Sequence, residues 1–411
     1  MNLFLFGILI CVSYSSTSAG KVRYDNYTLY RLTPKNEREV NLLKNIEESN
    51  PSGYDFWTSA RSVGTPVEIL IPPQSGNALR RISSIFGIHT EVLIENIQEK
   101  IDQEAGSLEG SGDFDWTKYH TVEEINQWLE SLVDKYPGVV TLIKGGSSYE
   151  NRDIIGVKVS FSSKNQNKAV WIDSNIHARE WIAGAVNTFI LNEILTNKDI
   201  RNVSESHDWY IFPVINPDGY SYTFTKDRMW RKTRTPYGKC FGADPNRNWD
   251  YRWNTGGAGR DPCGETYPGP KAFSEREIST LSQYISSIAS KLKVFISFHS
   301  YSQIVLLPYG HTSQHLDNYN VTYPIGVKAA HSLAKRYKTK FDVGTITESV
   351  GIATGSSVDW VKGVHHIPVA FGFELRDTGR YGFLLPAKQI IPSGLETLDA
   401  ILTIVEESDK V

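Results

Sequence analysis

The chain has 411 residues, a length that predicts two to three domains. Hydrophobic residues make up 40% of it and charged residues 22%, proportions that are ordinary for a globular protein. The formal net charge of -3 argues against a nucleic-acid partner.

The N-terminus begins with an apolar segment, residues 3–12, followed by a serine-rich stretch and the small residues Thr17, Ser18 and Ala19. This order predicts a secretory signal peptide over residues 1–19, cleaved after Ala19. A buried N-terminal strand is the alternative, which the serine-rich stretch disfavours. No later segment reaches the roughly 18 consecutive apolar residues of a membrane-spanning helix. We therefore expect a secreted, extracellular protein without a membrane partner.

The next part of the chain predicts a small α/β unit over residues 20–112. Strand-like runs at 27–32 and 67–71 alternate with helix-like runs at 36–48 and 75–86. Residues 102–113 are polar, rich in glycine and without periodicity, which predicts a linker. A larger unit then covers residues 113–411.

The larger unit begins with a clear helix signal. Thr121 and Glu124 have the spacing of a capping box. The apolar residues that follow fall on one helical face up to Pro137: Ile125, Trp128, Leu129 and Leu132. The same capping signal precedes two further amphipathic stretches, at Ser274 with Glu277 and at Ser393 with Glu396.

Nearly continuous apolar runs separate these helical segments, at residues 169–172, 209–215, 294–298 and 367–373. Such runs are typical of strands that are buried on both faces. We therefore expect an α/β fold with a mixed, mostly parallel central sheet covered by helices on both faces, preceded by the small α/β unit. Functional residues of such sheets gather where strands end.

Two histidines and a glutamate lie at such strand ends. His177 and Glu180 follow the run 169–172, and His299 ends the run 294–298. Two imidazoles and one carboxylate are the ligand set of a hydrolytic zinc site, with the fourth position left for water. The set indicates a metal-activated hydrolase. Alternatively, the first pair lies on the surface and the second histidine is a hydrogen-bonded core residue.

Two cysteines, Cys240 and Cys263, remain once the predicted signal peptide is removed. An even pair in a secreted chain indicates one disulfide, and two free thiols are the less favoured alternative outside the cell. Three glycosylation triplets, at Asn26, Asn202 and Asn320, are compatible with secretion.

Five sequence blocks carry a family resemblance: residues 177–181, 227–232, 244–250, 298–301 and 373–383. In this order and spacing, together with the cysteine pair, they resemble the zinc carboxypeptidase A/B family of secreted metallopeptidases. The resemblance covers essentially the whole chain after the predicted signal.

The resemblance implies a zymogen, in which residues 20–112 are an activation prosegment and residues 113–411 a catalytic domain holding one Zn²⁺. The implied partners are an activating protease and peptide or protein substrates with free C-termini. We expect a monomer.

The resemblance also implies reaction roles. His177, Glu180 and His299 correspond to the zinc ligands, Glu374 to the general base and later acid, and Arg231 to the residue that stabilises the oxyanion. These roles suit the residue types, because a buried carboxylate can move the proton of a zinc-activated water and a fixed guanidinium stabilises developing negative charge.

Substrate contacts are implied in the same way. Asn246 and Arg247 correspond to the pair that holds the substrate's terminal carboxylate, for which a planar guanidinium is suited. Arg179 and Tyr301 correspond to residues that line the subsites before the cleaved bond. Asp244 corresponds to the hydrogen-bond partner of the first zinc histidine.

Structural alternatives exist for three of these residues. Arg231 lies in a basic run that could be a solvated face, and Asn246 could be a turn residue. Glu374 could form an ion pair with Arg376 or Arg380, because an ionised carboxylate after an apolar strand is costly unless it is used or paired.

Substrate preference depends on the residue before the pair Asp359-Trp360, which in the family lies at the base of the side-chain pocket. Here that residue is Val358. An apolar base cannot pair with a cation, so we expect a preference for aromatic or aliphatic C-terminal residues. A register error of one residue would place Asp359 in the pocket and invert this prediction. The other corresponding pocket positions are apolar or small: Leu306, Gly310, Val350 and Ala353.

The chain departs from the family at two points. Gly351 stands where the family usually has a mobile tyrosine, so we expect weaker substrate binding with the chemistry retained. The connector has no basic residue between Lys100 and Lys118, although family zymogens are commonly activated by trypsin-like cleavage there. Cleavage at Lys100 and cleavage by a different protease both remain open.

Two other functions compete with this prediction. A non-catalytic secreted binding protein with the same fold would explain the missing tyrosine, but the intact ligand set and Glu374 count against it. A zinc amidohydrolase or aminopeptidase is disfavoured by the pair Asn246-Arg247, which suits a carboxylate terminus.

Overall fold

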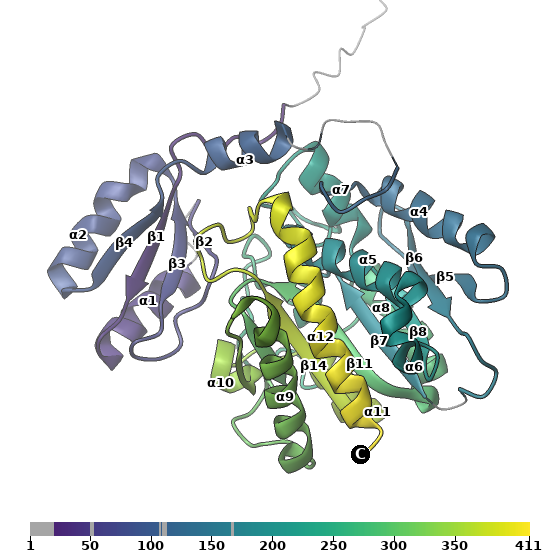
Figure 1. Ribbon diagram of the computed structural model, residues 1–411. Coiled ribbons are helices and arrows are strands. Elements are labelled where there is room, and N and C mark those ends of the chain that lie inside the picture. The colour runs from purple at the N-terminus through teal and green to yellow at the C-terminus, as the bar shows by residue number, and fades with distance from the viewer. Residues whose placement is uncertain (1–19, 50–52, 107, 109–112, 166–167) are drawn as a thin grey trace, which may run out of the picture.

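The computed structural model describes residues 20–49, 53–106, 108, 113–165 and 168–411. The predicted signal peptide lies outside these residues. Within them, no helix combines the length and the apolar character needed to cross a bilayer. Two units lie side by side, and the helix at residues 97–106 leads from the first unit toward the second (Figure 1).

The N-terminal unit is a four-stranded antiparallel sheet with the order β2-β3-β1-β4. Its elements are β1 (Thr28–Thr33), α1 (Glu37–Ser49), β2 (Asp55–Phe56), β3 (Val67–Ile71), η1 (Pro73–Ser75), α2 (Gly76–Phe86), β4 (His89–Ile94) and α3 (Ile97–Gly106). The strands and helices predicted for this region are all present, with small differences at their ends. The sequence did not predict β2, β4 and α3.

Helix α3 corrects the predicted start of the linker, because it continues to Gly106. The side-chain amide of Gln98 donates a hydrogen bond to the Asp102 carboxylate within this helix at 2.8 Å. Glu104 accepts two hydrogen bonds from the Arg228 guanidinium of the second unit, at 2.5 and 3.1 Å. A polar, glycine-containing stretch can therefore be helical when another unit supplies the partners of its side chains.

The second unit is built on an eight-stranded sheet with the order β13-β12-β14-β11-β7-β8-β6-β5. Its strands are β5 (Val140–Ser147), β6 (Asp153–Val159), β7 (Ala169–Ser174), β8 (Asp208–Phe212), β11 (Leu292–Ser300), β12 (Ile304–Leu307), β13 (Asp342–Thr345) and β14 (Val369–Leu375). Four strand pairings, β11/β14, β11/β7, β7/β8 and β12/β13, are parallel, and the three others are antiparallel. The predicted mixed, mostly parallel sheet is confirmed.

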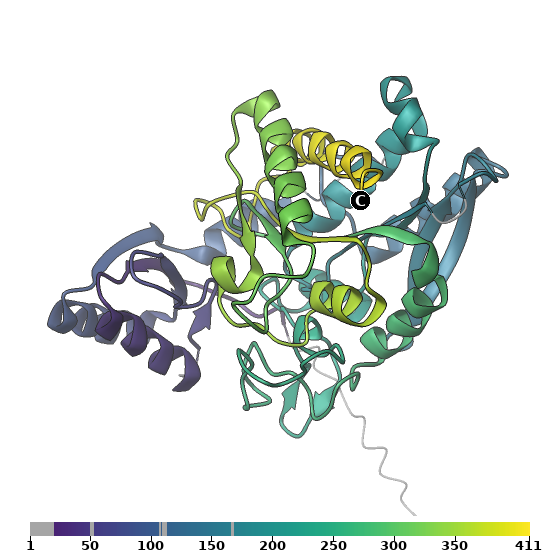
Figure 2. The same cartoon turned by 90° about the horizontal axis from the view of Figure 1, so that it is seen from below.

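Helices cover both faces of this sheet (Figures 1 and 2). One face packs against α4 (Val122–Lys135), α5 (Trp181–Thr196), α9 (Tyr319–Tyr337) and α12 (Ile390–Ser408). The other face packs against α8 (Arg276–Ile288) and α11 (Ser357–His365). The remaining helices and short strands are α6 (Arg201–Ser204), α7 (Pro217–Thr225), β9 (Pro236–Tyr237), β10 (Cys240–Phe241) and α10 (Ile346–Val350).

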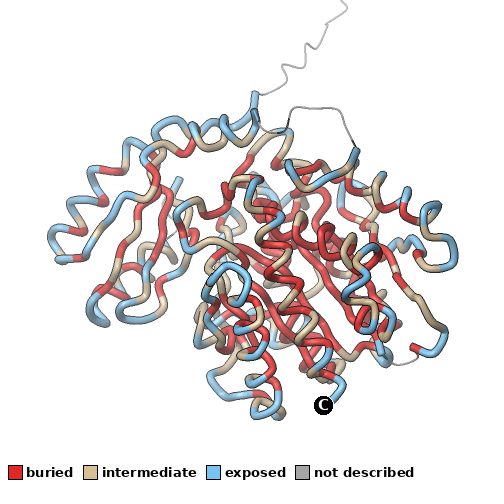
Figure 3. The backbone as a smooth tube through the Cα atoms, in the orientation of Figure 1, coloured by how far each residue is buried: buried red, intermediate tan, exposed pale blue. Residues whose placement is uncertain are grey.

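The two covered faces explain the apolar runs of the sequence. Along β7, Val170 and Ile172 point into one layer, whereas Ala169 and Trp171 point into the other. Each position of such a strand is buried, so apolar residues do not alternate with polar ones. The buried residues accordingly concentrate on the central strands and the inner sides of the helices (Figure 3).

One of the three predicted helix caps is confirmed. Thr121 and Glu124 form the reciprocal capping box of α4. The predicted box at Ser274 is wrong, because its hydroxyl donates to Glu275 and α8 begins at Arg276. The predicted box at Ser393 is also wrong, because that residue lies inside α12 and Glu396 pairs with Arg376.

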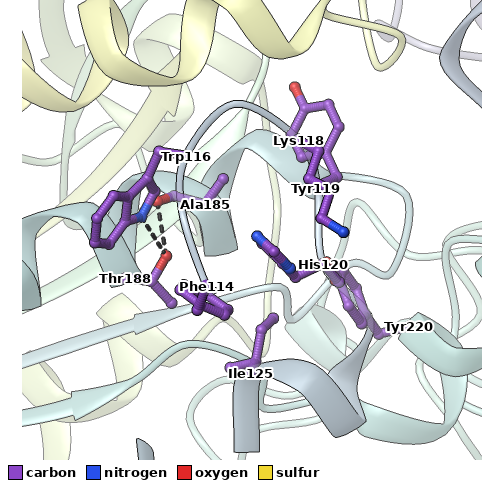
Figure 4. A pocket seen from close by; sticks show the side chains of 9 residues that line it. All are labelled: Phe114, Trp116, Lys118, Tyr119, His120, Ile125, Ala185, Thr188 and Tyr220. Carbon is purple, nitrogen blue, oxygen red and sulfur yellow. Dashed lines mark hydrogen bonds between the residues drawn. The ribbon is translucent and has the colours of Figure 1, made fainter. Parts of the chain in front are cut away.

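Aromatic residues fix the start of the second unit after the connector. Phe114 stacks on His120 and on Trp128, with ring centroids 4.1 and 4.5 Å apart. The indole of Trp116 donates to the hydroxyl of Thr188 on α5 at 3.0 Å (Figure 4). The small pocket that these side chains help to line contains none of the predicted site residues. We assign it a packing role.

Candidate active site

The three predicted metal ligands lie together at the ends of neighbouring parallel strands. His177 and Glu180 follow β7, and His299 lies near the end of β11, which pairs with β7. Their potential ligand atoms all lie within 4.8 Å of one another, and all three side chains are buried. The alternatives of a surface pair and an unrelated core histidine are therefore wrong.

The orientation of these side chains fits a metal ion. The Nδ1 atoms of His177 and His299 are 3.3 Å apart, and each faces an oxygen of Glu180, at 2.7 and 3.2 Å. The Nε2 atoms point away from this centre, toward Asp244 Oδ1 at 3.2 Å and Ser297 Oγ at 3.3 Å. Outer partners of this kind fix the ring orientation that a metal-bound histidine needs. The donor set of two nitrogens and one carboxylate is one that zinc binds.

Glu374 lies beside this cluster on the adjacent strand. The register of β11 and β14 pairs it directly with His299. Arg376 instead pairs with Glu396 in α12, at 2.5 Å, so the proposed structural pairing of Glu374 with Arg376 is wrong. Burial raises the pKa of the Glu374 carboxyl to about 8. The charge of His299 acts to lower this pKa, and the negative charge of Glu180 acts to raise it. A zinc ion bound nearby would pull this pKa downward, because its positive charge favours the carboxylate.

Arg231 is fixed at the other side of the cluster by Asp244. Its Nη2 donates to Asp244 Oδ2 at 2.8 Å, and its Nη1 lies 4.0 Å from Glu180 Oε1. Burial disfavours the ionised form of Asp244, but the charges of Arg231, His177 and Arg247 hold its pKa well below the usual range. Arg231 is thus an oriented, largely buried guanidinium, and the alternative of a solvated basic face is wrong.

Asn246 and Arg247 lie on the short 3-10 helix η3 (Pro245–Arg247) that follows Asp244. The Asn246 side-chain oxygen accepts a hydrogen bond from the Ser357 amide at 3.0 Å, and therefore links this helix to the start of α11. The Arg247 guanidinium donates to the carbonyl of Gly257 at 3.1 Å. The Asn246 side chain thus borders the segment that carries Val358.

Val358 and Asp359 point to different surroundings. Val358 is buried in the apolar layer that also contains the predicted pocket residues Leu306, Ala353 and, partly buried, Val350. The carboxylate of Asp359 accepts hydrogen bonds from the Gly310 amide at 2.9 and 3.0 Å. His311 Nδ1 lies 3.1 Å from the same carboxylate. Asp359 is therefore already bonded, which argues against the alternative register.

Gly351 ends helix α10 with φ at +90°. Its amide donates to the Thr347 carbonyl at 3.1 Å, so it closes the helix in a conformation that residues other than glycine adopt at a cost. A Cβ atom built at this position would contact only Arg61 of the N-terminal unit, at 3.7 Å. The space above Gly351 is thus covered by the N-terminal unit and not by another side chain of the second unit.

The N-terminal unit covers both residues predicted to line the upstream subsites. Asp55 accepts a hydrogen bond from the Arg179 guanidinium at 2.7 Å. The Tyr301 hydroxyl donates to Glu68, which also pairs with Arg31 at 2.6 Å. A substrate cannot occupy the same positions while these contacts exist.

Trp57 completes this cover. Its ring lies against Phe383 and Tyr301, with centroids 4.9 and 6.1 Å apart. A Cβ atom at Gly382 would come within 2.5 Å of the Trp57 ring, so only glycine permits this approach.

The sequence did not identify Asp55, Trp57 and Glu68 as contacts of the site. Each lies more than 100 residues before its partner, and an Asp or Glu in a short strand resembles any solvated residue. The predicted disulfide, in contrast, is present between Cys240 and Cys263, with Cα atoms 5.2 Å apart.

Two family models match this chain. Residues 125–400 match the family model described as zinc carboxypeptidase, and residues 30–104 match the one described as carboxypeptidase activation peptide. The chain is 41% identical to zinc carboxypeptidase A 1 of Anopheles gambiae, over 97% of this chain and 94% of the relative. It is 35% identical to carboxypeptidase A1 of Bos taurus, over 98% of each chain.

Solved structures agree with these sequence matches. Thrombin activatable fibrinolysis inhibitor superposes with a TM-score of 0.85 at 31% identity, over 94% of this chain and all of the other. The carboxypeptidase A of Helicoverpa armigera superposes with a TM-score of 0.87 at 27% identity, over 94% of this chain and 98% of the other.

Proposed function

Since this chain belongs to the zinc carboxypeptidase family and carries its activation peptide, we propose that it is a secreted enzyme that removes single C-terminal residues with aromatic or aliphatic side chains. The enzyme is an A-type zinc carboxypeptidase made as a zymogen. The preference rests on one observation above the others, the buried Val358 beside an Asp359 that is already bonded to Gly310.

We assign the metal-binding role to His177, Glu180 and His299. Zinc held there would lower the pKa of a water molecule to about 7 and polarise the scissile carbonyl. Glu374 lies beside the ligands, and Arg376 is engaged by Glu396 of α12, so Glu374 is available to take a proton and return it to the leaving amine. Arg231, held by Asp244, would stabilise negative charge on the carbonyl oxygen.

Substrate binding follows from the charged residues around this centre. We propose that Arg247, with Asn246, holds the terminal carboxylate of the substrate, because a planar guanidinium matches a carboxylate. A terminus held at a fixed distance from the metal ligands selects the last peptide bond. Arg179 and Tyr301 then contact residues before the cleaved bond, which is where Asp55 and Glu68 of the N-terminal unit lie.

We propose a signal peptide at residues 1–19, a prosegment at 20–112 and a catalytic domain at 113–411. The helical position of Lys100 bears on activation, because a protease binds an extended segment and α3 would have to unfold first. We therefore favour cleavage after α3 by a protease that does not require a basic residue. The proposed partners are peptides and proteins with free C-termini, as substrates, and this activating protease. We propose that the protein itself is a monomer.

A peptide pair tests the proposed preference. Enzyme freed of its prosegment by limited proteolysis should release terminal Phe at least about 100-fold faster than terminal Lys, because an unpaired cation in an apolar pocket is costly. Val358→Asp should reverse this preference. Val364→Asp places the same change on the exposed side of α11 and should leave the preference intact. Release of Lys by the unaltered enzyme would show that Asp359 faces the pocket.

Substitution of Gly351 tests the effect of the missing tyrosine. Gly351→Tyr should lower KM severalfold by adding a hydroxyl and a ring over the bound substrate, but it should also lower Tm. The positive φ at this position, combined with a ψ of -175°, costs a non-glycine residue about 1–3 kcal/mol. Gly351→Ala carries the same strain without the ring and is the matched control. A KM that does not differ between the two variants would contradict a role for the tyrosine.

A further inference from the structure

The disulfide closes a loop that reaches the centre of the active site. Glu265 lies two residues after Cys263, in a turn closed by the hydrogen bond from the Tyr267 amide to the Gly264 carbonyl at 3.4 Å. The Tyr267 carbonyl accepts a hydrogen bond from the Asp244 amide at 2.7 Å. Since Asp244 also contacts His177 and Arg231, the turn that carries Glu265 has a fixed position relative to the metal ligands.

Glu265 faces several cations but is bonded to none of them. Among the residues that the structure describes, no hydrogen bond or ion pair of its carboxylate is found, although the residue is half-buried. The nearby positive charges belong to Arg179, Lys232 and Arg231. Each of these is engaged elsewhere: Arg179 with Asp55, Lys232 with the Pro262 carbonyl at 2.8 Å, and Arg231 with Asp244.

Asp55 of the prosegment lies close enough to Glu265 for the two carboxylates to repel each other. Burial raises the pKa of the Glu265 carboxyl, and the negative charge of Asp55 raises it further, against the lowering effect of Arg179. Asp55 is also the group that occupies Arg179, a residue proposed to line the subsites before the cleaved bond. When the prosegment leaves, side chains of the substrate replace Asp55 next to Arg179 and Glu265.

We propose that Glu265 selects the charge of the substrate side chains that precede the cleaved bond. It favours lysine or arginine there and disfavours aspartate or glutamate. Without this carboxylate, the positive charge of Arg179 beside the substrate would favour acidic side chains there. The inference rests on the proposed exopeptidase function and adds a second level of specificity to it, separate from the pocket at Val358.

Two peptide series test this inference. Blocked tripeptides ending in Phe carry Lys, Gln or Glu either at the residue next to Phe or at the one before it. The enzyme, released from the full chain by limited proteolysis, is assayed for Phe release at low and high salt. Glu265→Gln should lower the ratio of kcat/KM for the Lys peptide over the Glu peptide at least about tenfold in one series, and less at high salt.

Two variants serve as controls. Glu265→Asp keeps the charge and should keep the direction of the preference. Glu130→Gln removes one exposed negative charge on α4, outside the disulfide loop, and should leave the ratio unchanged. An unchanged ratio in Glu265→Gln, with Phe still released, would overturn the inference alone. Failure of the unaltered enzyme to release Phe from the Gln peptides would overturn the proposed function and, with it, the inference.

Discussion

Replacing Glu374 with glutamine will lower kcat about 10²–10⁴-fold, the range expected when a general acid–base group is lost. The glutamine keeps the shape of the side chain but cannot take or return a proton. The zinc content should stay at one ion per chain, because Glu374 is not a member of the ligand cluster. Metal analysis and steady-state kinetics on the same sample separate the two effects.

The pH dependence of kcat/KM provides a second test of the role of Glu374. Glu374 must be ionised to accept a proton, so kcat/KM of the unaltered enzyme should rise as the pH increases through its pKa. Zinc would place that pKa below the value of about 8 that burial and the surrounding charges produce without the metal. Glu374→Gln should remove this rise. Glu205→Gln, a change at an exposed site, should preserve both the rate and the profile. A loss of less than tenfold in Glu374→Gln would exclude its role as the base.

Replacing His299 with alanine will remove both bound zinc and activity. The loss of affinity should exceed the roughly 10–100-fold cost of losing an outer partner of a metal ligand, since one of three protein ligands is then missing. Zinc raises the stability of a protein that binds it in the folded state, so zinc should increase the Tm of the unaltered full chain and not that of the variant.

A second histidine provides the control for this experiment. His331→Ala changes an exposed residue of α9 and should leave the zinc content, the Tm increase and the activity intact. A chelator should abolish the activity of the unaltered enzyme, and added zinc should restore it. Retention of one zinc ion by His299→Ala after dialysis would show that His177 and Glu180 hold the metal with a different partner.

The sequence predicted those parts of the fold that depend on local burial. The apolar runs at β7, β11 and β14 identified strands covered on both faces, because the apolar side chains there pack into one or the other of the two buried layers. Residues at the ends of these strands were then expected to meet, and His177, His299 and Glu374 do so.

Features that depend on distant partners were not predictable in the same way. Ser393 resembles a helix cap, but its segment lies inside α12. Helix α3 is stabilised by the contact between Glu104 and Arg228. These residues are 124 positions apart, so no local sequence pattern predicts their pairing. The role of Glu265 depends on a loop whose position is set by the disulfide and by Asp244.

The order of residues in the central sheet has a consequence for the newly made chain. His177 follows β7 and His299 lies on the neighbouring strand β11, but the two are separated by 122 residues. Contacts between residues so distant in sequence form late in folding, because long loops must close first. A partly synthesised chain therefore has no assembled metal centre and cannot hydrolyse peptides inside the cell that makes it. Protection of that cell thus begins during synthesis, before the prosegment has a finished site to cover.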